Sequence, residues 1–373
     1  MDVKETVKAT LKGGASGITA INTRGPELFL HDNHSVLSNK VGGISGRAIL
    51  ELGLKCVKEI RNLTDLPIIA CGGISTAEDL RRYKMAGANF FGIGSALSGM
   101  NAEEMKQYFH QLVIDFEKGG NTAPTFLKEK LNTEYQKYTV RENRFLAEDL
   151  FLLSLNKEIK MEPGQFIFAW LPEKGEKPFS VLDDAPLTLL IRKRGCFTEE
   201  LSKLREGDSL YIRGPHGNEV AGGWCPKVDR KILLVAGGTG LAALYLFAKK
   251  YQNTISLLGA KDKNHLAYLE EFKKLSKETY LSTENGEIGH KGLVTDILSE
   301  ILEKTKPEYC LNCGPAPMVK TAIEIEKKFL EPEKIYSSIE FLTKCGIGLC
   351  GSCTTSKGYR SCVDGTFLKP SQI

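Results

Sequence analysis

Apolar positions recur with two different periods, and each change of period marks a new region of the chain. In the first 118 residues, short apolar runs alternate with amphipathic segments. The clearest amphipathic segment is 47–62, where Leu50, Leu54 and Val57 fall on one helical face. The strands expected between helices are 17–22, 66–70 and 89–93. Strands that alternate with helices predict a parallel sheet.

Beyond residue 118 the pattern changes twice. A polar stretch at 119–137, which contains two glycines and Pro124, predicts a linker. The apolar runs that follow are short and separated by turn residues, as in a small antiparallel β-barrel. They are LFLLSL, QFIFAWL, LTLLIRKR and SLYIRGP. From Lys231, strand–helix alternation resumes with ILLVAGGTG and predicts a second α/β unit.

Composition narrows the class of protein. A chain of 373 residues suggests about two or three domains. The net charge of +4 is small and spread along the chain, which gives no support to a nucleic-acid partner. The longest uncharged run, 232–248, is too short for a membrane span and contains glycines. The start of the chain is charged, without the apolar core of an export signal, so we expect a cytoplasmic protein.

Four cysteines near the C-terminus follow the spacing C-x4-C-x2-C-x8-C. They are Cys345, Cys350, Cys353 and Cys362. This spacing is typical of plant-type [2Fe–2S] sites, and the glycines between the cysteines allow a tight loop. Zinc is the main alternative, although zinc ribbons usually pair two C-x2-C knuckles. Disulfides or free thiols are a third possibility.

Glycine turns at strand ends form a second group of motifs. Ile232–Gly240 is a strand that enters a glycine-rich turn and then a helix, a pattern that can bind a nucleotide pyrophosphate. Cys313-Gly314-Pro315 also follows an apolar strand, and Gly214-Pro215-His216-Gly217 ends the barrel region. Each motif alone is equally consistent with a simple turn, but their order along the chain is informative.

From the N-terminal side, the order is Gly214–Gly217, Ile232–Gly240, Cys313–Pro315 and then the four cysteines. With its motifs in this order, the region 136–373 resembles the electron-transfer subunits of dihydroorotate dehydrogenase B, within the ferredoxin-reductase superfamily. The resemblance implies FAD contacts at Lys177, Pro178, Phe179 and Ser180, with Gly195 and Thr198 near the pyrophosphate. It implies NAD contacts at Gly237, Gly238, Gly240, Cys313, Gly314 and Pro315. Two departures are notable. Lys177 stands where many relatives carry arginine, and the glycine turn is looser than the usual G-x-G-T.

The N-terminal region carries glycine pairs at successive strand ends and resembles the C-terminal part of the catalytic subunits of dihydroorotate dehydrogenase. The resemblance implies that FMN is possible here, held by Gly46, Gly72, Gly73, Gly94 and Ser95, with Asn22 and Thr23 touching the pyrimidine substrate. Such glycines suit a phosphate site of a (β/α)8 barrel. The alternative is that they only allow helices to pack closely in a barrel fragment.

Only the last three of eight barrel strands can be found, and the region expected to hold the catalytic base is absent. We therefore assign no catalytic residue. Another polypeptide could supply the missing barrel half, the start could be truncated, or the region could be a self-standing remnant. An exposed sheet edge is an aggregation hazard, so we expect a hetero-oligomer with the catalytic chain.

These arguments define a multidomain α/β and β protein. The expected parts are a partial barrel (1–118), a linker (119–137), an FAD-binding β-barrel (138–228), an NAD-binding α/β domain (229–335) and a [2Fe–2S] domain (336–373). The expected function is electron transfer in pyrimidine biosynthesis, from dihydroorotate oxidation at FMN through the cluster and FAD to NAD+. A stand-alone NAD(P)H:acceptor reductase and a noncatalytic assembly subunit are the alternatives.

Overall fold

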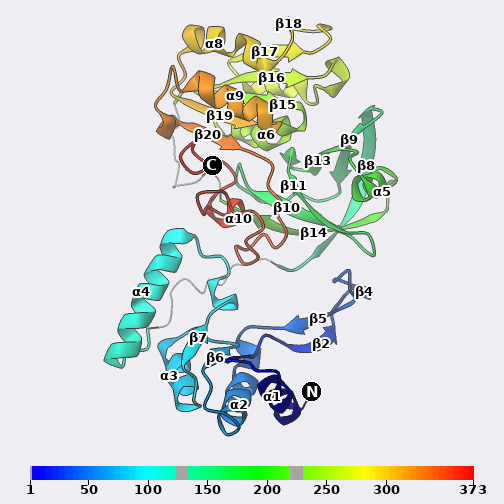
Figure 1. The fold of residues 1–373 in the computed structure, drawn as a ribbon. Coiled ribbons are helices and arrows are strands. Elements are labelled where there is room, and N and C mark those ends of the chain that lie inside the picture. Colours follow the sequence, from blue (N-terminus) through cyan, green and yellow to red (C-terminus); the bar gives the residue numbers. More distant parts are fainter. Residues whose placement is uncertain (1, 123–132, 219, 221–229) are drawn as a thin grey trace. The chain divides into compact units, whose positions relative to one another are not determined.

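The computed structural model describes residues 2–122, 133–218, 220 and 230–373 (Figure 1). The chain divides into two compact units, residues 1–131 and 132–373. Most of the predicted linker, with Pro124, and the end of the predicted FAD domain lie outside the described residues.

Unit 1 is built around a three-stranded parallel sheet with the order β1-β6-β7. The strands are β1 (Ile18–Ala20), β6 (Ile68–Cys71) and β7 (Phe90–Gly92). The helices are α1 (Val3–Lys12), α2 (Leu50–Arg61), α3 (Ala77–Met85) and α4 (Ala102–Lys118), with the 3-10 turns η1 (Arg47–Ile49) and η2 (Ser95–Leu97). The predicted parallel strands and the 47–62 helix are confirmed. Short antiparallel strands, which the sequence pattern did not predict, are β2 (Arg24–Leu28), β3 (Leu30–His31), β4 (His34–Ser35) and β5 (Val41–Ile44).

The two faces of this sheet differ in burial. Ile68 and Ala70 are buried in a core cluster that includes Val57 of α2. On the other face, Ile69 is 39% exposed and its register partner Phe90 is 59% exposed. One face of the sheet is therefore packed against helices, while the other presents apolar side chains to the surface.

Unit 2 begins with a seven-stranded antiparallel sheet in the order β11-β10-β14-β8-β9-β13-β12. The strands are β8 (Gln136–Ala147), β9 (Leu150–Leu155), β10 (Phe166–Leu171), β11 (Gly175–Ser180), β12 (Asp183–Asp184), β13 (Leu187–Arg192) and β14 (Ser209–His216). A short helix, α5 (Cys196–Ser202), follows β13. The predicted antiparallel strands are confirmed, whereas closure of the sheet into a barrel remains a prediction.

A six-stranded parallel sheet follows, with the order β18-β17-β16-β15-β19-β20. Its strands are β15 (Ile232–Gly237), β16 (Thr254–Ala260), β17 (Glu278–Thr283), β18 (His290–Lys291), β19 (Tyr309–Cys313) and β20 (Ile335–Ser338). Its helices are α6 (Leu241–Lys250), α7 (Leu269–Leu275), α8 (Val294–Thr305) and α9 (Ala316–Glu326), and α10 (Ser361–Asp364) lies in the C-terminal segment. No helix in the described ranges is both long enough and apolar enough to cross a bilayer.

Alternate residues of β15 enter two different cores, which explains its unbroken apolar sequence. Leu234 belongs to the cluster that contains Leu244 of α6. Leu233 belongs to the cluster that contains Leu298 of α8 and Val319 of α9. Both faces of the parallel sheet are therefore covered, as the α/β pattern predicts.

A buried polar group lies beside the second of these cores. Glu326 of α9 and Asn312 of β19 are both fully buried, and Asn312 Nδ2 donates to Glu326 Oε2 at 2.8 Å. Among the described residues, neither Glu326 Oε1 nor Asn312 Oδ1 has a hydrogen-bond partner by geometry, and the Cys310 thiol also interacts with Glu326. Burial raises the pKa of Glu326 to about 8. We infer that Glu326 is protonated, so that one carboxyl oxygen can donate a hydrogen bond while the other accepts from Asn312 Nδ2.

This inference predicts the effect of Glu326→Gln on stability. The glutamine can make the same two hydrogen bonds but cannot ionise. Because the folded pKa is raised, wild-type stability should fall by roughly 1.4 kcal/mol per pH unit as pH rises from the unfolded pKa to the folded pKa. The variant should lack this loss, as measured by urea unfolding at pH 5 and pH 8.

Glu324→Gln is the matched control, because Glu324 lies on the same helix with 72% of its side chain exposed. It should keep the wild-type pH profile. Identical pH profiles for wild type and Glu326→Gln would show that Glu326 is ionised in the folded protein.

Candidate functional site

Three of the four C-terminal cysteines lie in the loop that follows β20, and the fourth, Cys362, lies on α10. Cys353 Sγ lies 3.3 Å from Cys362 Sγ, and the Cys362 thiol is also hydrogen-bonded to Cys345. None of the nine described cysteines forms a disulfide. Within the described part of the chain, no three or more His, Cys, Asp and Glu side chains are gathered as the ligands of one ion. The structure therefore brings the thiols of Cys345, Cys353 and Cys362 together, whereas Cys350 Sγ donates to Ser352 Oγ at 3.3 Å.

Backbone amides point at these sulfurs. Cys345 Sγ accepts hydrogen bonds from the amides of Leu349 and Cys350, each at 3.4 Å. Cys362 Sγ accepts from the amide of Gly348 at 3.2 Å. The hydrogen bond from the Cys362 thiol, with these amides, lowers the pKa of Cys345 to about 3. Thiolate ligands with amide donors to sulfur are the chemistry that iron–sulfur clusters use.

A cavity of about 470 Å³ lies between the FAD motif and the C-terminal segment. It is lined by Pro178, Phe179 and Ser180 of β11, and by Phe341 and Thr343 from the segment that leads to the cysteines. Its volume is in the range of small-molecule sites. The cavity thus joins parts of the chain that lie about one hundred and sixty residues apart in the sequence.

The remaining predicted FAD residues lie outside this cavity lining. Lys177 is exposed on β11. Gly195 is the N-cap residue of α5, and Thr198 Oγ1 donates to the Gly195 carbonyl at 3.0 Å. Two arginines that the sequence did not single out, Arg192 and Arg194, do line the cavity.

The two predicted NAD turns are in direct contact. They are Gly237–Gly240, at the end of β15, and Cys313-Gly314-Pro315, at the end of the neighbouring parallel strand β19. A Cβ atom at position 240 would lie 2.2 Å from the carbonyl oxygen of Cys313. Glycine at this position is therefore required for the turns to approach each other, independently of any ligand.

A second cavity, of about 560 Å³, is also lined by the Gly237–Thr239 turn. Arg192 and Pro315 also line both cavities. Lys261, His265 and Glu284 line only the second, at the carboxyl ends of β16 and β17. Ligands of open α/β sheets bind at this edge.

His265 connects the second cavity to the antiparallel sheet. Its Nδ1 lies 2.7 Å from Asp262 Oδ1, and its Nε2 lies 3.0 Å from Asp149 Oδ1 in the β8–β9 turn. Asp149 also pairs with Arg192 at 2.7 Å. Hydrogen bonds from His265 and Arg192 lower the pKa of Asp149 to about 2. This carboxylate therefore stays ionised and holds Arg192 and His265 at the cavity edge.

In unit 1, the loops that precede η1 and follow β6 and β7 come together. A Cβ at Gly46 would lie 3.6 Å from Ser95 Oγ, and one at Gly72 would contact Ile21 and Ile49. Gly94 has open space around it. A Cβ at Gly73 would lie 2.8 Å from Leu50 Cβ, so close packing of α2 accounts for that glycine without a ligand.

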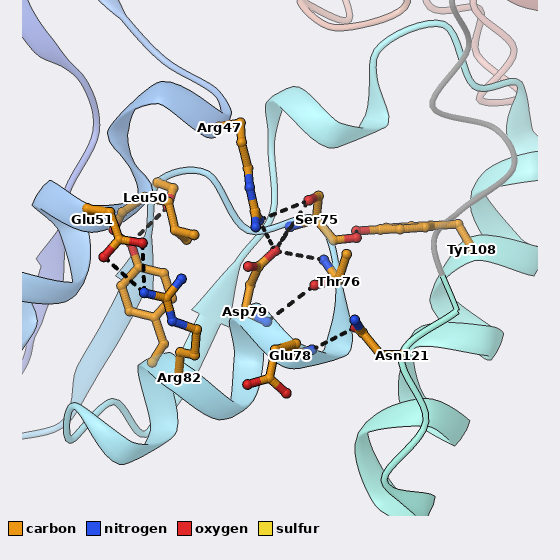
Figure 2. A network of polar contacts seen from close by, with 12 residues as sticks. Arg47, Leu50, Glu51, Ser75, Thr76, Glu78, Asp79, Arg82, Tyr108 and Asn121 are labelled. Atoms are coloured by element: carbon orange, nitrogen blue, oxygen red, sulfur yellow. Dashed lines mark hydrogen bonds and ion pairs between the residues drawn. The ribbon is translucent and has the colours of Figure 1, made fainter.

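A buried carboxylate organises this corner (Figure 2). Asp79 is 1% exposed and accepts from the amides of Ser75 and Thr76, each at 3.0 Å. Arg47 Nη1 lies 2.5 Å from Asp79 Oδ2 and keeps 61% of its side chain exposed. Burial raises the pKa of Asp79, but the bonds from Arg47 and these amides outweigh burial and lower it. Arg47 is therefore held beside Gly46 with an accessible guanidinium.

The predicted substrate residues Asn22 and Thr23 are exposed. Thr23 packs against Gly43, where a Cβ would lie 2.4 Å from Thr23 Oγ1. Their role in binding a pyrimidine remains a prediction.

Comparison with known proteins gives matches for both units. A family model described as dihydroorotate dehydrogenase matches residues 1–113. The probable electron transfer subunit of dihydroorotate dehydrogenase B (NAD(+)) from Thermococcus kodakarensis is 37% identical over 243 residues, which are 64% of this chain and 98% of that protein. The electron transfer subunit from Caldanaerobacter subterraneus subsp. tengcongensis is 37% identical over 251 residues, which are 64% of this chain and 97% of that protein.

The chain belongs to the family of dihydroorotate dehydrogenase B electron transfer subunits. A solved structure from a study of an NADH-dependent reduced ferredoxin-NADP oxidoreductase is also similar, with 30% identity and a TM-score of 0.56 over 63% of this chain and 88% of that one. The family resemblance inferred from the order of motifs is thus confirmed, and the chain is an oxidoreductase. Residues 1–113, with their separate match, are a region additional to that family.

Several charged residues of this family member could not be identified from its motifs. Arg192 and Arg194 stand directly before the Gly195 turn, so a basic pair before a glycine turn was the available signal. Arg47 and His265 carry no such local signal. Their positions depend on contacts with Asp79 and Asp149, which are distant in sequence.

The contact between the two glycine turns predicts the effect of Gly240→Ala. Because the new Cβ would overlap a backbone carbonyl, the turns must separate, at a cost of about 1–3 kcal/mol. Urea unfolding should show this loss of stability. Thr239→Ala is the control, since it shortens a neighbouring side chain of the same turn and should remain close to wild type. Equal stability of the two variants would contradict the close packing.

Proposed function

We propose that this chain carries electrons in pyrimidine biosynthesis, between dihydroorotate oxidation and NAD+, with FAD and a [2Fe–2S] cluster bound in unit 2. The observation that carries the proposal is the pair of cavities around Gly237–Thr239, the first of which is also lined by the segment leading to the cysteine loop. When bound, FAD exchanges hydride with nicotinamide and single electrons with the cluster. Family membership does not favour the stand-alone reductase or the noncatalytic subunit.

FAD would occupy the first cavity. Pro178, Phe179 and Ser180 line it from β11, and Arg192 and Arg194 bring positive charge to it. A guanidinium binds phosphate through a planar fork, which a lysine cannot provide. We therefore propose that these arginines take the phosphate-binding role that Lys177 leaves open, while Gly195 and Thr198 shape the turn beside them.

NAD would occupy the second cavity. Gly238 has open space around it and borders both cavities. Gly237, Gly240 and Gly314 permit the contact between the two turns, and Cys313 and Pro315 line the first cavity. Gly238 and Pro315, which border both cavities, would contact the dinucleotide, and Cys313 would face it from the first cavity.

The [2Fe–2S] cluster would be held by Cys345, Cys350, Cys353 and Cys362. The amide bonds to two of these sulfurs are the contacts that stabilise thiolate charge in such sites. The chain's own contribution is to hold the thiolates in place and to donate these bonds.

FMN and dihydroorotate would lie on unit 1. Gly46, Gly72, Gly94 and Ser95 would face the FMN phosphate with Arg47, while Gly73 mainly serves helix packing. Asn22 and Thr23 would contact the pyrimidine. The exposed sheet face of Ile69 and Phe90 would be covered by the missing barrel half or by the dehydrogenase catalytic chain. We also propose the domain boundaries 1–118, 119–137, 138–228, 229–335 and 336–373, and a cytoplasmic location.

The cluster assignment predicts the iron content of cysteine variants. Wild type purified without oxygen should hold about two irons per chain. Cys350→Ser should lose more than half of this iron, because it removes a ligand thiolate. Cys196→Ser is the control, since Cys196 is an exposed cysteine outside the loop and should keep full iron content. Full iron in both variants would contradict the assignment.

The unit 1 assignment predicts flavin content. The chain purified alone should release FAD, and FMN should appear only when a dihydroorotate dehydrogenase catalytic chain is produced with it. Arg47→Ala in the paired preparation should lower FMN and leave FAD unchanged, as measured by separating the released flavins. Arg82→Ala, an arginine of α3 that pairs with Glu51, should change neither. FMN unaffected by Arg47→Ala would contradict a phosphate contact.

A further inference from the structure

Arg213 of β14 is a buried arginine, with 7% of its side chain exposed. Its Nε and Nη2 donate to the two carboxylate oxygens of Glu176, each at 2.9 Å. The guanidinium lies over the Phe168 ring, 3.7 Å from the ring centroid. A bidentate ion pair stacked on an aromatic ring fixes the orientation of all five N–H groups.

The guanidinium also contacts Tyr135, His216 and the cysteine loop. Its Nε lies 3.3 Å from the Tyr135 hydroxyl, and its Nη1 lies 3.2 Å from His216 Nε2. Nη1 donates to the carbonyl oxygen of Cys345 at 3.0 Å, and Nη2 lies 3.5 Å from that of Lys344. Cys345 is the first of the four cysteines and lies 132 residues from Arg213 in the chain. Arg213 therefore connects β14 to the residue at which the cysteine loop begins.

The ion pair between Arg213 and Glu176 also reaches β11, the strand that carries the predicted FAD motif. Glu176 lies on β11 two residues before Pro178, which lines the first cavity. Phe168 lies on β10 between β11 and β14, and a Cβ at Gly346 would lie 2.6 Å from its ring. The Glu176–Arg213–Cys345 series thus joins the strand of the flavin motif to the cysteine loop through two charged side chains.

We propose that Arg213 is the positioning residue that ties the cluster loop to the flavin strand, and that its charge helps to set the reduction potential of the cluster. The inference rests on the proposed function. Arg213 and Glu176 form a neutral pair, so loss of either charge leaves a net charge next to the peptide of a cluster ligand. Reduction adds a negative charge to the cluster, so loss of the arginine charge disfavours reduction and loss of the glutamate charge favours it.

The test compares Arg213→Gln, Glu176→Gln and Arg213→Lys in the anaerobic holoprotein. The measurements are an electrode-mediated redox titration of the cluster and its EPR spectrum when reduced. Arg213→Gln should shift the one-electron equilibrium at least tenfold toward the oxidised cluster, about 59 mV, and Glu176→Gln should shift it in the opposite direction. Arg213→Lys keeps the charge but loses the fork, so it should change the EPR spectrum with a smaller shift in potential.

Arg205→Gln is the matched control, because Arg205 is an exposed arginine in the turn that precedes β14. It should leave potential and spectrum at wild-type values. Retained FAD and thermal unfolding show whether Arg213→Gln folds. If it does not, the inference is tested by the shift of Glu176→Gln toward the reduced cluster and by the changed EPR spectrum of Arg213→Lys. Wild-type potential and spectrum in all folded variants would overturn the inference. A wild type with FAD but no iron would instead overturn the proposed cluster.

Discussion

The contact of two backbone turns at the carboxyl edge of one parallel sheet shapes the region that borders both cavities of unit 2. Strands β15 and β19 are neighbours and run in the same direction, so the turns that follow them meet at the same edge. The approach at Gly240 and Cys313 is too close for any side chain at position 240. The Gly237–Thr239 turn borders both cavities, which we propose as the flavin and dinucleotide sites.

In the function we propose, unit 2 uses three redox groups in sequence. The first cavity is bordered by the flavin motif, the two glycine turns and the residues that precede the cysteine loop. Arg213 then joins the loop to the flavin strand through Glu176. Electron transfer requires only that the groups are held at fixed distances and potentials, so the protein's task is to provide rigid contacts rather than reactive side chains.

Local patterns allowed much of this to be predicted. The cysteine spacing and the strand–glycine turns are contiguous in sequence, and the structure places both turns at one sheet edge and three of the four cysteines close together. Arg192, Arg213 and His265 could not be identified as site residues, because each depends on partners brought close only by tertiary folding. Lys177 was expected at the flavin phosphate by its place in a motif, yet it is exposed outside the cavity. The family comparison, rather than geometry, decided the function.

The most direct test of the account is the reoxidation of photochemically reduced holoprotein by NAD+ under anaerobic conditions. FAD absorbance and the EPR signal of the reduced cluster are followed in the same samples. We predict that excess NAD+ reoxidises both the flavin and the cluster, because both belong to one path that ends at the nicotinamide. Reoxidation of the flavin with a cluster that stays reduced would contradict the account.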